Sequence, residues 1–282
     1  MELPTSLAAE VHRNVLTALA EDIGGGDLTA LLTPAARRSQ GAVISRETAV
    51  LAGSAWFDAC FKQLDGSATI EWSALDGDTV AAGQTLCRVE ATTRSLLTAE
   101  RAALNFLQLL SATATQTRRY VELVAGTRAR IVDTRKTIPG LRLAQKYAVT
   151  CGGGSNHRLG LYDGILIKEN HIIAAGGVTP ALEQALAIGR DDVFIQIEVE
   201  TLEQLAEALD AGAEMILLDN MTLDTMRQAV GLTAGRAVLE ASGGVRLDTV
   251  RAIAETGVDR ISIGNLTKDI RAIDLSLRHS EG

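Results

Sequence analysis

The sequence predicts an α/β protein in two parts, and three observations support this fold class. Segments between about residues 40 and 95 are short and β-like, a long helical segment follows, and beyond residue 128 short apolar runs alternate with amphipathic helices. Alternation of that kind implies parallel strands joined by crossover helices. The 282 residues suffice for one large or two modest domains with a sizeable core.

The first part is expected to combine helices with a β-meander or hairpin. A helix over roughly residues 5–20 precedes the β-like segments, which turn at Asp76-Gly77-Asp78 and at Gly83-Gln84. Over residues 98–125 the apolar side chains recur close to helical spacing, at Leu104, Leu107, Leu110, Ala114 and Val121. We place the boundary on this helix and expect domains 1–112 and 113–282.

The second part repeats a unit of strand and helix. Helices are expected near residues 201–211, 222–230 and 246–256, and strands at 130–133, 165–168, 193–199, 215–219, 237–241 and 260–264. An internal echo aligns residues 210–220 with 255–265, so that Gly212 matches Gly257. Repeated helix–glycine–strand units suit a (β/α) barrel better than an open sheet.

Polar residues and glycines mark the carboxyl-terminal tips of the candidate strands. In a barrel these tips meet on one face, where barrel enzymes hold their chemistry. The candidate site therefore contains Asp133 with Arg135 and Lys136, then Lys168, Glu198, Asp219, Ser242-Gly243-Gly244 and Gly264-Asn265.

One segment reverses the charge of the chain. Between Arg135 and His171 there are six cationic and two acidic residues, so this segment has a net charge of +4. The net charge of the whole chain is −8, so the remaining residues together carry −12. Forked Arg donors and Lys point charges suit a multiply anionic ligand, although a solvated basic face is the alternative. Gly152-Gly153-Gly154 in this segment either lets backbone N–H groups approach a ligand or forms a flexible turn. His157 and His171 are candidate site residues or ordinary histidines bonded to backbone.

Two glycine turns and two carboxylates suggest a phosphate and a cation. Ser242-Gly243-Gly244, between a strand and a helix, and Gly264-Asn265 suit a phosphate, with helix capping and close packing as the alternative. Glu198 and Asp219 could serve Mg²⁺ as oxygen ligands or cap helices, and Glu200 shares the side of Glu198 on an ideal strand. Arg101, expected in the first turn of the long helix, opposes the helix dipole unless an anion or a surface partner such as Glu100 lies there.

Composition narrows the classes of partner and compartment. An excess of eight acidic residues argues against nucleic acid and anionic membrane as partners. Cys60, Cys87 and Cys151 are too few and too far apart for a disulfide framework or a zinc site. Charged residues interrupt the N-terminus where a signal peptide needs an apolar run, so we expect a cytoplasmic protein.

Seven motifs together carry a family resemblance along nearly the whole chain. They are EDIGGGDLTA (21–30), ERAALNFLQLLS (100–111), DTRKTIPGLR (133–142), KYAVTCGGGSNHRLGLYDGILIKENH (146–171), IEVET (197–201), ILLDNM (216–221) and EASGGV (240–245). The set closely resembles the quinolinate phosphoribosyltransferase family, also called nicotinate-nucleotide pyrophosphorylase (carboxylating), of NAD biosynthesis. The resemblance implies an N-terminal α/β sandwich domain, an incomplete TIM-like α/β barrel, and a C-terminal tail, 266–282, that packs back on the first domain. It also implies a homodimer, or a hexamer of dimers, with an active site shared across the interface.

The same resemblance implies a role for each candidate residue. Arg101 would reach the site of the neighbouring subunit. Quinolinate and the phosphoribosyl donor would be bound by Thr134, Arg135, Lys136, His157, Arg158 and Lys168. Glu198 and Asp219 would lie near the ribose hydroxyls and the Mg²⁺-pyrophosphate, which favours Glu198 over Glu200, and with Lys136 and Lys168 they would form the catalytic set. The 5-phosphate would be held by Ser242, Gly243, Gly244, Gly264 and Asn265.

The implied reaction joins the pyridine nitrogen of quinolinate to C1 of 5-phosphoribosyl 1-pyrophosphate (PRPP). Its products are nicotinate mononucleotide, pyrophosphate and CO₂. Two alternatives keep the fold but change the acceptor: nicotinate itself, or the unassigned substrate of the molybdenum-transport-associated homologues. A third is a non-catalytic sensor of phosphorylated ligands, which would release no pyrophosphate in the presence of Mg²⁺.

Overall fold

The computed structural model describes residues 5–188 and 192–280, which form two compact units. The first unit takes in the chain up to residue 118, residues 137–153 and the segment from 266 onward, and the second takes in 119–136 and 154–265. The chain therefore passes between the units four times, whereas the expected domains 1–112 and 113–282, with the tail 266–282 returning to the first, imply two passages.

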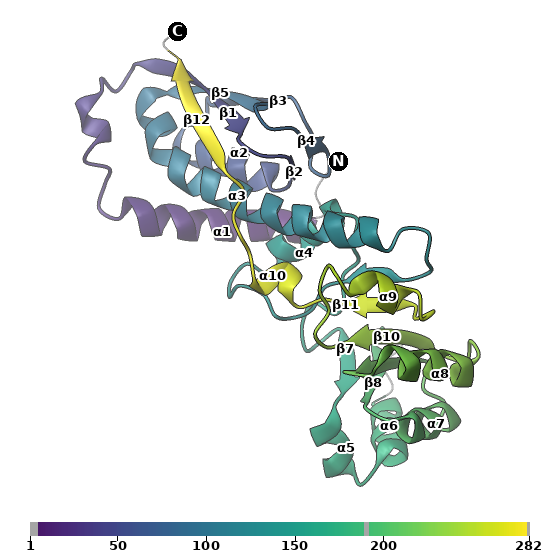
Figure 1. Cartoon of the computed structure of the whole chain (residues 1–282). Helices are drawn as coiled ribbons and strands as arrows, with labels where there is room; N and C mark the ends of the chain where they lie inside the picture. Colours follow the sequence, from purple (N-terminus) through teal and green to yellow (C-terminus); the bar gives the residue numbers. More distant parts are fainter. Residues whose placement is uncertain (1–4, 189–191, 281–282) are drawn as a thin grey trace. The chain divides into compact units, whose positions relative to one another are not determined.

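The first unit contains a four-stranded antiparallel sheet and a two-stranded one. The order of the larger sheet is β12-β1-β5-β3, and β2 pairs with β4. The C-terminal strand β12 thus lies beside β1 (Figure 1). The elements are α1 (Thr5–Ile23), η1 (Ala30–Leu32), β1 (Arg38–Ser45), β2 (Ala49–Val50), α2 (Ser54–Leu64), β3 (Thr69–Trp72), β4 (Thr79–Val80), β5 (Thr85–Thr92), α3 (Thr93–Leu123), α4 (Arg142–Cys151), α10 (Asn265–Lys268) and β12 (Leu275–Ser280).

Helix α3 supplies much of the core of this unit. Leu104, Leu107 and Leu110 are at most 2% exposed, as the helical spacing of the sequence predicts. The helix starts at Thr93, so Arg101 lies in its third turn and the expected position in the first turn is wrong. No helix among residues 5–188 and 192–280 combines the length and apolar character needed to span a membrane.

The half-buried carboxylate of Asp65 stabilises the first unit through hydrogen bonds. Its Oδ1 accepts from the Ser67 hydroxyl at 2.6 Å, and its Oδ2 accepts from the Thr92 backbone N–H at 2.8 Å. The Ser67 hydrogen bond is the largest of the causes that lower the pKa of Asp65 to about 2.

We expect Asp65→Asn to lower the free energy of unfolding by about 1 kcal/mol at neutral pH. The folded-state pKa lies below the ordinary value of 3.8, so the ionised form stabilises the fold fully above pH 3.8 and loses this effect as the pH falls through about 2. Urea unfolding of the wild type and of Asp65→Asn at several pH values tests this. The difference between their free energies of unfolding should disappear on acidification, and a difference independent of pH would contradict the expectation.

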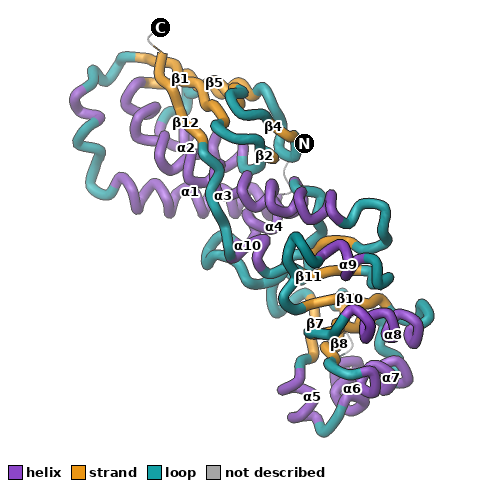
Figure 2. Tube along the Cα trace, in the orientation of Figure 1, coloured by secondary structure: helices purple, strands orange, loops and turns teal. Residues whose placement is uncertain are grey.

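The second unit is a single parallel sheet of six strands. Its order is β6-β11-β10-β9-β8-β7, so β6 and β7, consecutive in the chain, occupy its two ends and do not pair with each other. This is the incomplete barrel that the family resemblance implied, and Figure 2 shows α6, α7 and α8 grouped beside the strands. The elements are β6 (Arg130–Val132), β7 (Gly164–Ile167), α5 (Glu169–Ala175), α6 (Val178–Ala187), β8 (Phe194–Val199), α7 (Leu202–Asp210), β9 (Met215–Asp219), α8 (Leu223–Thr233), β10 (Val238–Ser242), α9 (Val250–Ala254) and β11 (Arg260–Ser262).

The internal echo corresponds to a repeated structural unit. Gly212 follows α7 with φ 82° and Gly257 follows α9 with φ 96°, a left-handed conformation that favours glycine, and a strand begins three residues after each. The helix–glycine–strand prediction is therefore confirmed at both places.

Candidate active site

The strand ends of the second unit bring the candidate residues to one edge of the sheet. The parallel register aligns Asp219 with Ser242 and Glu198 with Leu217. Because all six strands run in the same direction, the loops after them open at the same edge. That edge carries Thr134, Arg135 and Lys136 after β6, Lys168 after β7, Glu198 in β8, Asp219 at the end of β9, Ser242 to Gly244 after β10, and Gly264 and Asn265 after β11. Arg101 belongs to the first unit, where it is exposed on α3.

Two guanidinium groups lie close enough to affect each other. Burial, and secondly the charge of Arg135, lower the pKa of Arg158. Arg158 Nη1 donates to the carbonyl of Gly164 at 3.1 Å, whereas the buried Nε of Arg135 has no hydrogen-bond partner within the described part of the chain. Neighbouring like charges with an unused donor form a site that an anion would stabilise.

A lysine–glutamate pair connects the ends of β7 and β8. Lys168 Nζ lies 3.2 Å from Glu198 Oε2, and the Glu198 side chain is 15% exposed. Glu200 lies beyond the strand, is exposed, and donates its backbone N–H to Gln204 Oε1. Glu198 is therefore the carboxylate that meets Lys168. His171 Nδ1 accepts from the Lys168 backbone N–H at 2.9 Å, which gives His171 a local role at the start of α5.

Lys136 extends across the backbone of Gly264. A Cβ at Gly264 would lie 3.1 Å from Lys136 Cδ and 3.8 Å from its Nζ. The turn carrying Lys136 is held by Thr134, whose Oγ1 accepts the Lys136 backbone N–H at 3.1 Å. Asn265 Nδ2 donates to the hydroxyl oxygen of buried Tyr120 at 3.2 Å, which fixes the residue after the glycine.

The loop after β10 depends on glycine at position 243. Gly243 has φ 100° and Gly244 has φ 58°, and a Cβ on Gly243 would lie 2.0 Å from Asn220 Oδ1. Asn220 is itself held, since its backbone N–H donates to the Ser242 carbonyl at 3.0 Å. The expected helix at 246–256 is only Val250–Ala254, so the helix start expected directly after the glycines is wrong.

The triple glycine has a structural role at two of its positions. Gly152 N donates to the Ala148 carbonyl and Gly153 N to the Thr150 carbonyl, so the prediction that these N–H groups approach a ligand is wrong. A Cβ at Gly152 would lie 2.5 Å from the Ala114 carbonyl oxygen of α3. Glycine is therefore needed here for close packing of the end of α4 on α3.

His157 uses both ring nitrogens within the protein. Nδ1 accepts the Arg158 backbone N–H at 2.7 Å, and Nε2 lies 2.8 Å from Gln196 Oε1. Gln196 Nε2 in turn donates to Glu240 Oε2 at 3.2 Å. Sequence reasoning missed Gln196 and Glu240. Each is a polar residue between apolar ones in a parallel strand, a pattern that does not by itself distinguish a buried position from a strand end.

The protein alone does not form a metal cage in the described residues. No three His, Cys, Asp or Glu side chains among residues 5–188 and 192–280 gather as a metal site. Glu198 and Asp219 are oxygen donors on adjacent strands, but the first pairs with Lys168 and the second accepts from Asn220 Nδ2 at 2.8 Å. Such a set fits Mg²⁺ only if substrate and water complete the coordination.

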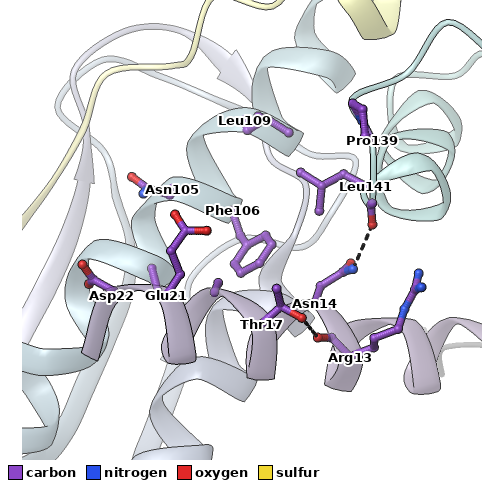
Figure 3. A pocket seen from close by; sticks show the side chains of 13 residues that line it. Arg13, Asn14, Thr17, Glu21, Asp22, Asn105, Phe106, Leu109, Pro139 and Leu141 are labelled. Carbon is purple, nitrogen blue, oxygen red and sulfur yellow. Dashed lines mark hydrogen bonds between the residues drawn. The ribbon is translucent and has the colours of Figure 1, made fainter. Parts of the chain in front are cut away.

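The first unit contains a cavity of about 420 Å³. None of its 13 lining residues is a candidate site residue. Figure 3 shows Glu21 and Asp22 at one end of this cavity and Asn14 farther along it. Asn14 Nδ2 donates a hydrogen bond to the Gly140 carbonyl at 3.0 Å. Asn14 thereby fixes the segment that precedes α4.

The fold is that of an α/β-barrel enzyme whose strand-end loops carry cationic side chains and glycine turns. The chain belongs to the quinolinate phosphoribosyltransferase family. Residues 27–111 match the family model described as the N-terminal domain of quinolinate phosphoribosyl transferase, and residues 113–278 match the model of its C-terminal domain.

Relatives are similar over most of the chain. A probable nicotinate-nucleotide pyrophosphorylase [carboxylating] of Bacillus subtilis is 41% identical, covering 91% of this chain and 89% of its own length. The structure of the nicotinate-nucleotide pyrophosphorylase from Francisella tularensis superposes with a TM-score of 0.94 at 43% identity, covering 99% and 98% of the two chains. The corresponding protein from Ehrlichia chaffeensis has a TM-score of 0.91 at 37% identity, covering 99% and 100%.

Proposed function

We propose that this chain transfers the phosphoribosyl group of PRPP to quinolinate and removes one carboxylate, a reaction of NAD biosynthesis. The bond from the pyridine nitrogen to C1 of ribose forms while the bond from C1 to pyrophosphate breaks. The bond from C2 of the pyridine to its carboxylate then breaks, its electron pair stays on C2, and a proton replaces CO₂. The products are nicotinate mononucleotide, pyrophosphate and CO₂.

The observation that carries the choice of acceptor is the pair Arg135 and Arg158. Two adjacent guanidinium groups, one with a buried Nε that no described residue pairs with, match an acceptor with two carboxylates better than one with a single carboxylate. Their task is to hold the ring against C1 of ribose, because positioning two anionic reactants together removes much of the entropic barrier.

The donor side uses residues from six strand ends. Lys136 beside Gly264 and the loop of Gly243 and Gly244 suit the 5-phosphate and the departing pyrophosphate, since lysine charge and backbone N–H groups stabilise developing negative charge. Glu198 and Asp219 suit the ribose hydroxyls. Lys168, 3.2 Å from Glu198, is then placed to serve both substrates.

Magnesium is part of this proposal. Glu198 and Asp219 would hold Mg²⁺ together with substrate pyrophosphate and water, and the ion would supply positive charge for the leaving group. We expect a chelator such as EDTA to abolish turnover while the melting temperature of the free protein stays constant, because the described residues alone form no cage. Turnover measured after dialysis, with and without added Mg²⁺, tests this, and full activity in metal-free protein would contradict it.

We also propose a cytoplasmic homodimer in which Arg101 completes the site of the neighbouring subunit. An exposed arginine on α3 supports this role because it is available to an anion outside its own unit. Dimers could associate further into a hexamer.

The decisive experiment offers quinolinate and nicotinate in parallel to the purified protein with PRPP and Mg²⁺. Mononucleotide and CO₂ from quinolinate alone are the expected result. Product from nicotinate alone would reassign the arginine pair, and no pyrophosphate from either acceptor would overturn the enzymatic proposal in favour of a sensor.

A further inference from the structure

Two buried polar side chains lie inside the barrel beneath the site. Gln196 precedes Glu198 by two residues on β8, and Glu240 precedes Ser242 by two on β10, so each shares a strand face with a site residue. Both are 0% exposed. Barrel interiors are normally filled by branched apolar side chains, so this pair requires a specific reason.

The hydrogen bonds of this pair assign the tautomer of His157. Nδ1 accepts from the Arg158 backbone N–H at 2.7 Å, so a neutral imidazole carries its proton on Nε2. That proton points to Gln196 Oε1 at 2.8 Å, which directs the Gln196 amide nitrogen to Glu240 Oε2 at 3.2 Å. A glutamine is suited to this place because its amide accepts from the histidine and donates to the carboxylate at once.

The surroundings give His157 little freedom to turn. Its side chain is 8% exposed and its ring packs edge-on against Phe194, with centroids 5.5 Å apart. Its backbone N–H donates to buried Asp133 Oδ1 at 2.8 Å. Glu240 Oε2 lies 3.7 Å from His157 Nε2, and Glu240 Oε1 has no hydrogen-bond partner in the described part of the chain.

We infer that Gln196 and Glu240 are positioning residues for the acceptor pocket. They hold His157 as the Nε2–H tautomer, and Nδ1 of His157 then fixes the backbone N–H of Arg158, whose guanidinium lies near that of Arg135. The inference rests on the proposed function, since that function assigns Arg158 to the carboxylates of quinolinate. It predicts that the two residues affect binding of the acceptor and not of PRPP.

Steady-state kinetics of four variants test this role. Gln196→Met and Glu240→Met are expected to raise the KM for quinolinate on the order of tenfold and leave the KM for PRPP within about twofold, because each breaks one link of a hydrogen-bonded chain. Glu240→Gln should retain most of the affinity, since its amide oxygen still accepts from Gln196. Thr233→Val is the matched control. Thr233 is a buried residue of the same unit, 2% exposed, and its hydroxyl is not part of the hydrogen bonds that join His157, Gln196 and Glu240.

A spectroscopic readout separates this inference from the proposed function. Imidazole ¹⁵N spectra recorded at alkaline pH report the tautomers of the four histidines without any turnover. The signal of His157 is assigned by its loss in His157→Asn. We expect Nε2–H in the wild type and in Glu240→Gln, and a mixture in Gln196→Met.

Three outcomes would overturn the inference: an Nδ1–H tautomer in the wild type, unchanged quinolinate KM in both methionine variants, or equal increases in the KM of both substrates. The wild-type tautomer decides the case if the methionine variants do not fold. A wild-type chain that shows the Nε2–H tautomer but no turnover of quinolinate would overturn the proposed function alone.

Discussion

Replacing Arg135 or Arg158 with alanine is expected to raise the KM for quinolinate by about 30-fold or more. Each truncation leaves a carboxylate of the acceptor in the pocket without its guanidinium, and breaking such a charge pair typically costs about 2–5 kcal/mol. Stability should be unchanged or higher, because burial and the charge of Arg135 already lower the pKa of Arg158, so removing one of two like charges relieves repulsion in the free enzyme.

Arg227→Ala is the matched control for these variants. Arg227 is a half-exposed arginine of the same unit that pairs with Asp224 on α8, so its loss should leave both KM values unchanged. Kinetics with quinolinate varied at saturating PRPP give the KM for quinolinate, and thermal unfolding gives the stability of each variant. Quinolinate KM values like those of Arg227→Ala in both pocket variants would show that the acceptor lies elsewhere.

The strand ends that carry the candidate site residues were predictable from the sequence. The strand expected at 215–219 is β9 as observed. The one expected at 193–199 begins one residue before β8, and the one expected at 237–241 is displaced by one residue from β10 at both ends. A parallel strand is an apolar run closed by a polar residue, so its end is visible locally. Glu198 and Asp219 could therefore be placed at strand ends from the sequence alone.

Features that depend on distant contacts were not predictable in this way. Helix α2, Ser54–Leu64, lies between two of the segments expected to be β-like, in a stretch where no helix was expected. Its Trp56, Phe57 and Phe61 also favour strands and are buried in the core. Residues 137–153 belong to the first unit although the chain on both sides of them belongs to the second. No local pattern reports such a return.

The polar pair beneath the site was missed for a related reason. Gln196 on β8 and Glu240 on β10 can be recognised as a pair only when the fold brings the loop with His157 against both strands. In sequence, each is a polar residue between apolar neighbours with a second polar residue two positions later, a pattern equally typical of a strand end or an exposed edge.

Alanine at position 243 is expected to have the largest effect of any single methyl group added to the loops of the site. A Cβ there would lie 2.0 Å from Asn220 Oδ1 and 3.1 Å from Asn220 Cα, at φ 100°, so both the backbone and Asn220 must move. Strain and overpacking of this kind cost about 2–4 kcal/mol of stability. Because Asn220 also bonds Asp219 and the Ser242 carbonyl, we expect PRPP affinity to fall by about 100-fold or more.

Gly244→Ala separates this steric effect from a general loss of loop flexibility. Gly244 has φ 58°, a left-handed value that alanine can adopt for about 1–2 kcal/mol. Apart from its two chain neighbours, no residue that the structure describes has an atom within 4 Å of the added Cβ. Thermal unfolding and calorimetric titration with PRPP should therefore rank the proteins as wild type, Gly244→Ala and then Gly243→Ala. Equal losses in the two variants would mean that the loop responds to backbone stiffness, and that its contact with Asn220 does not shape the phosphate site.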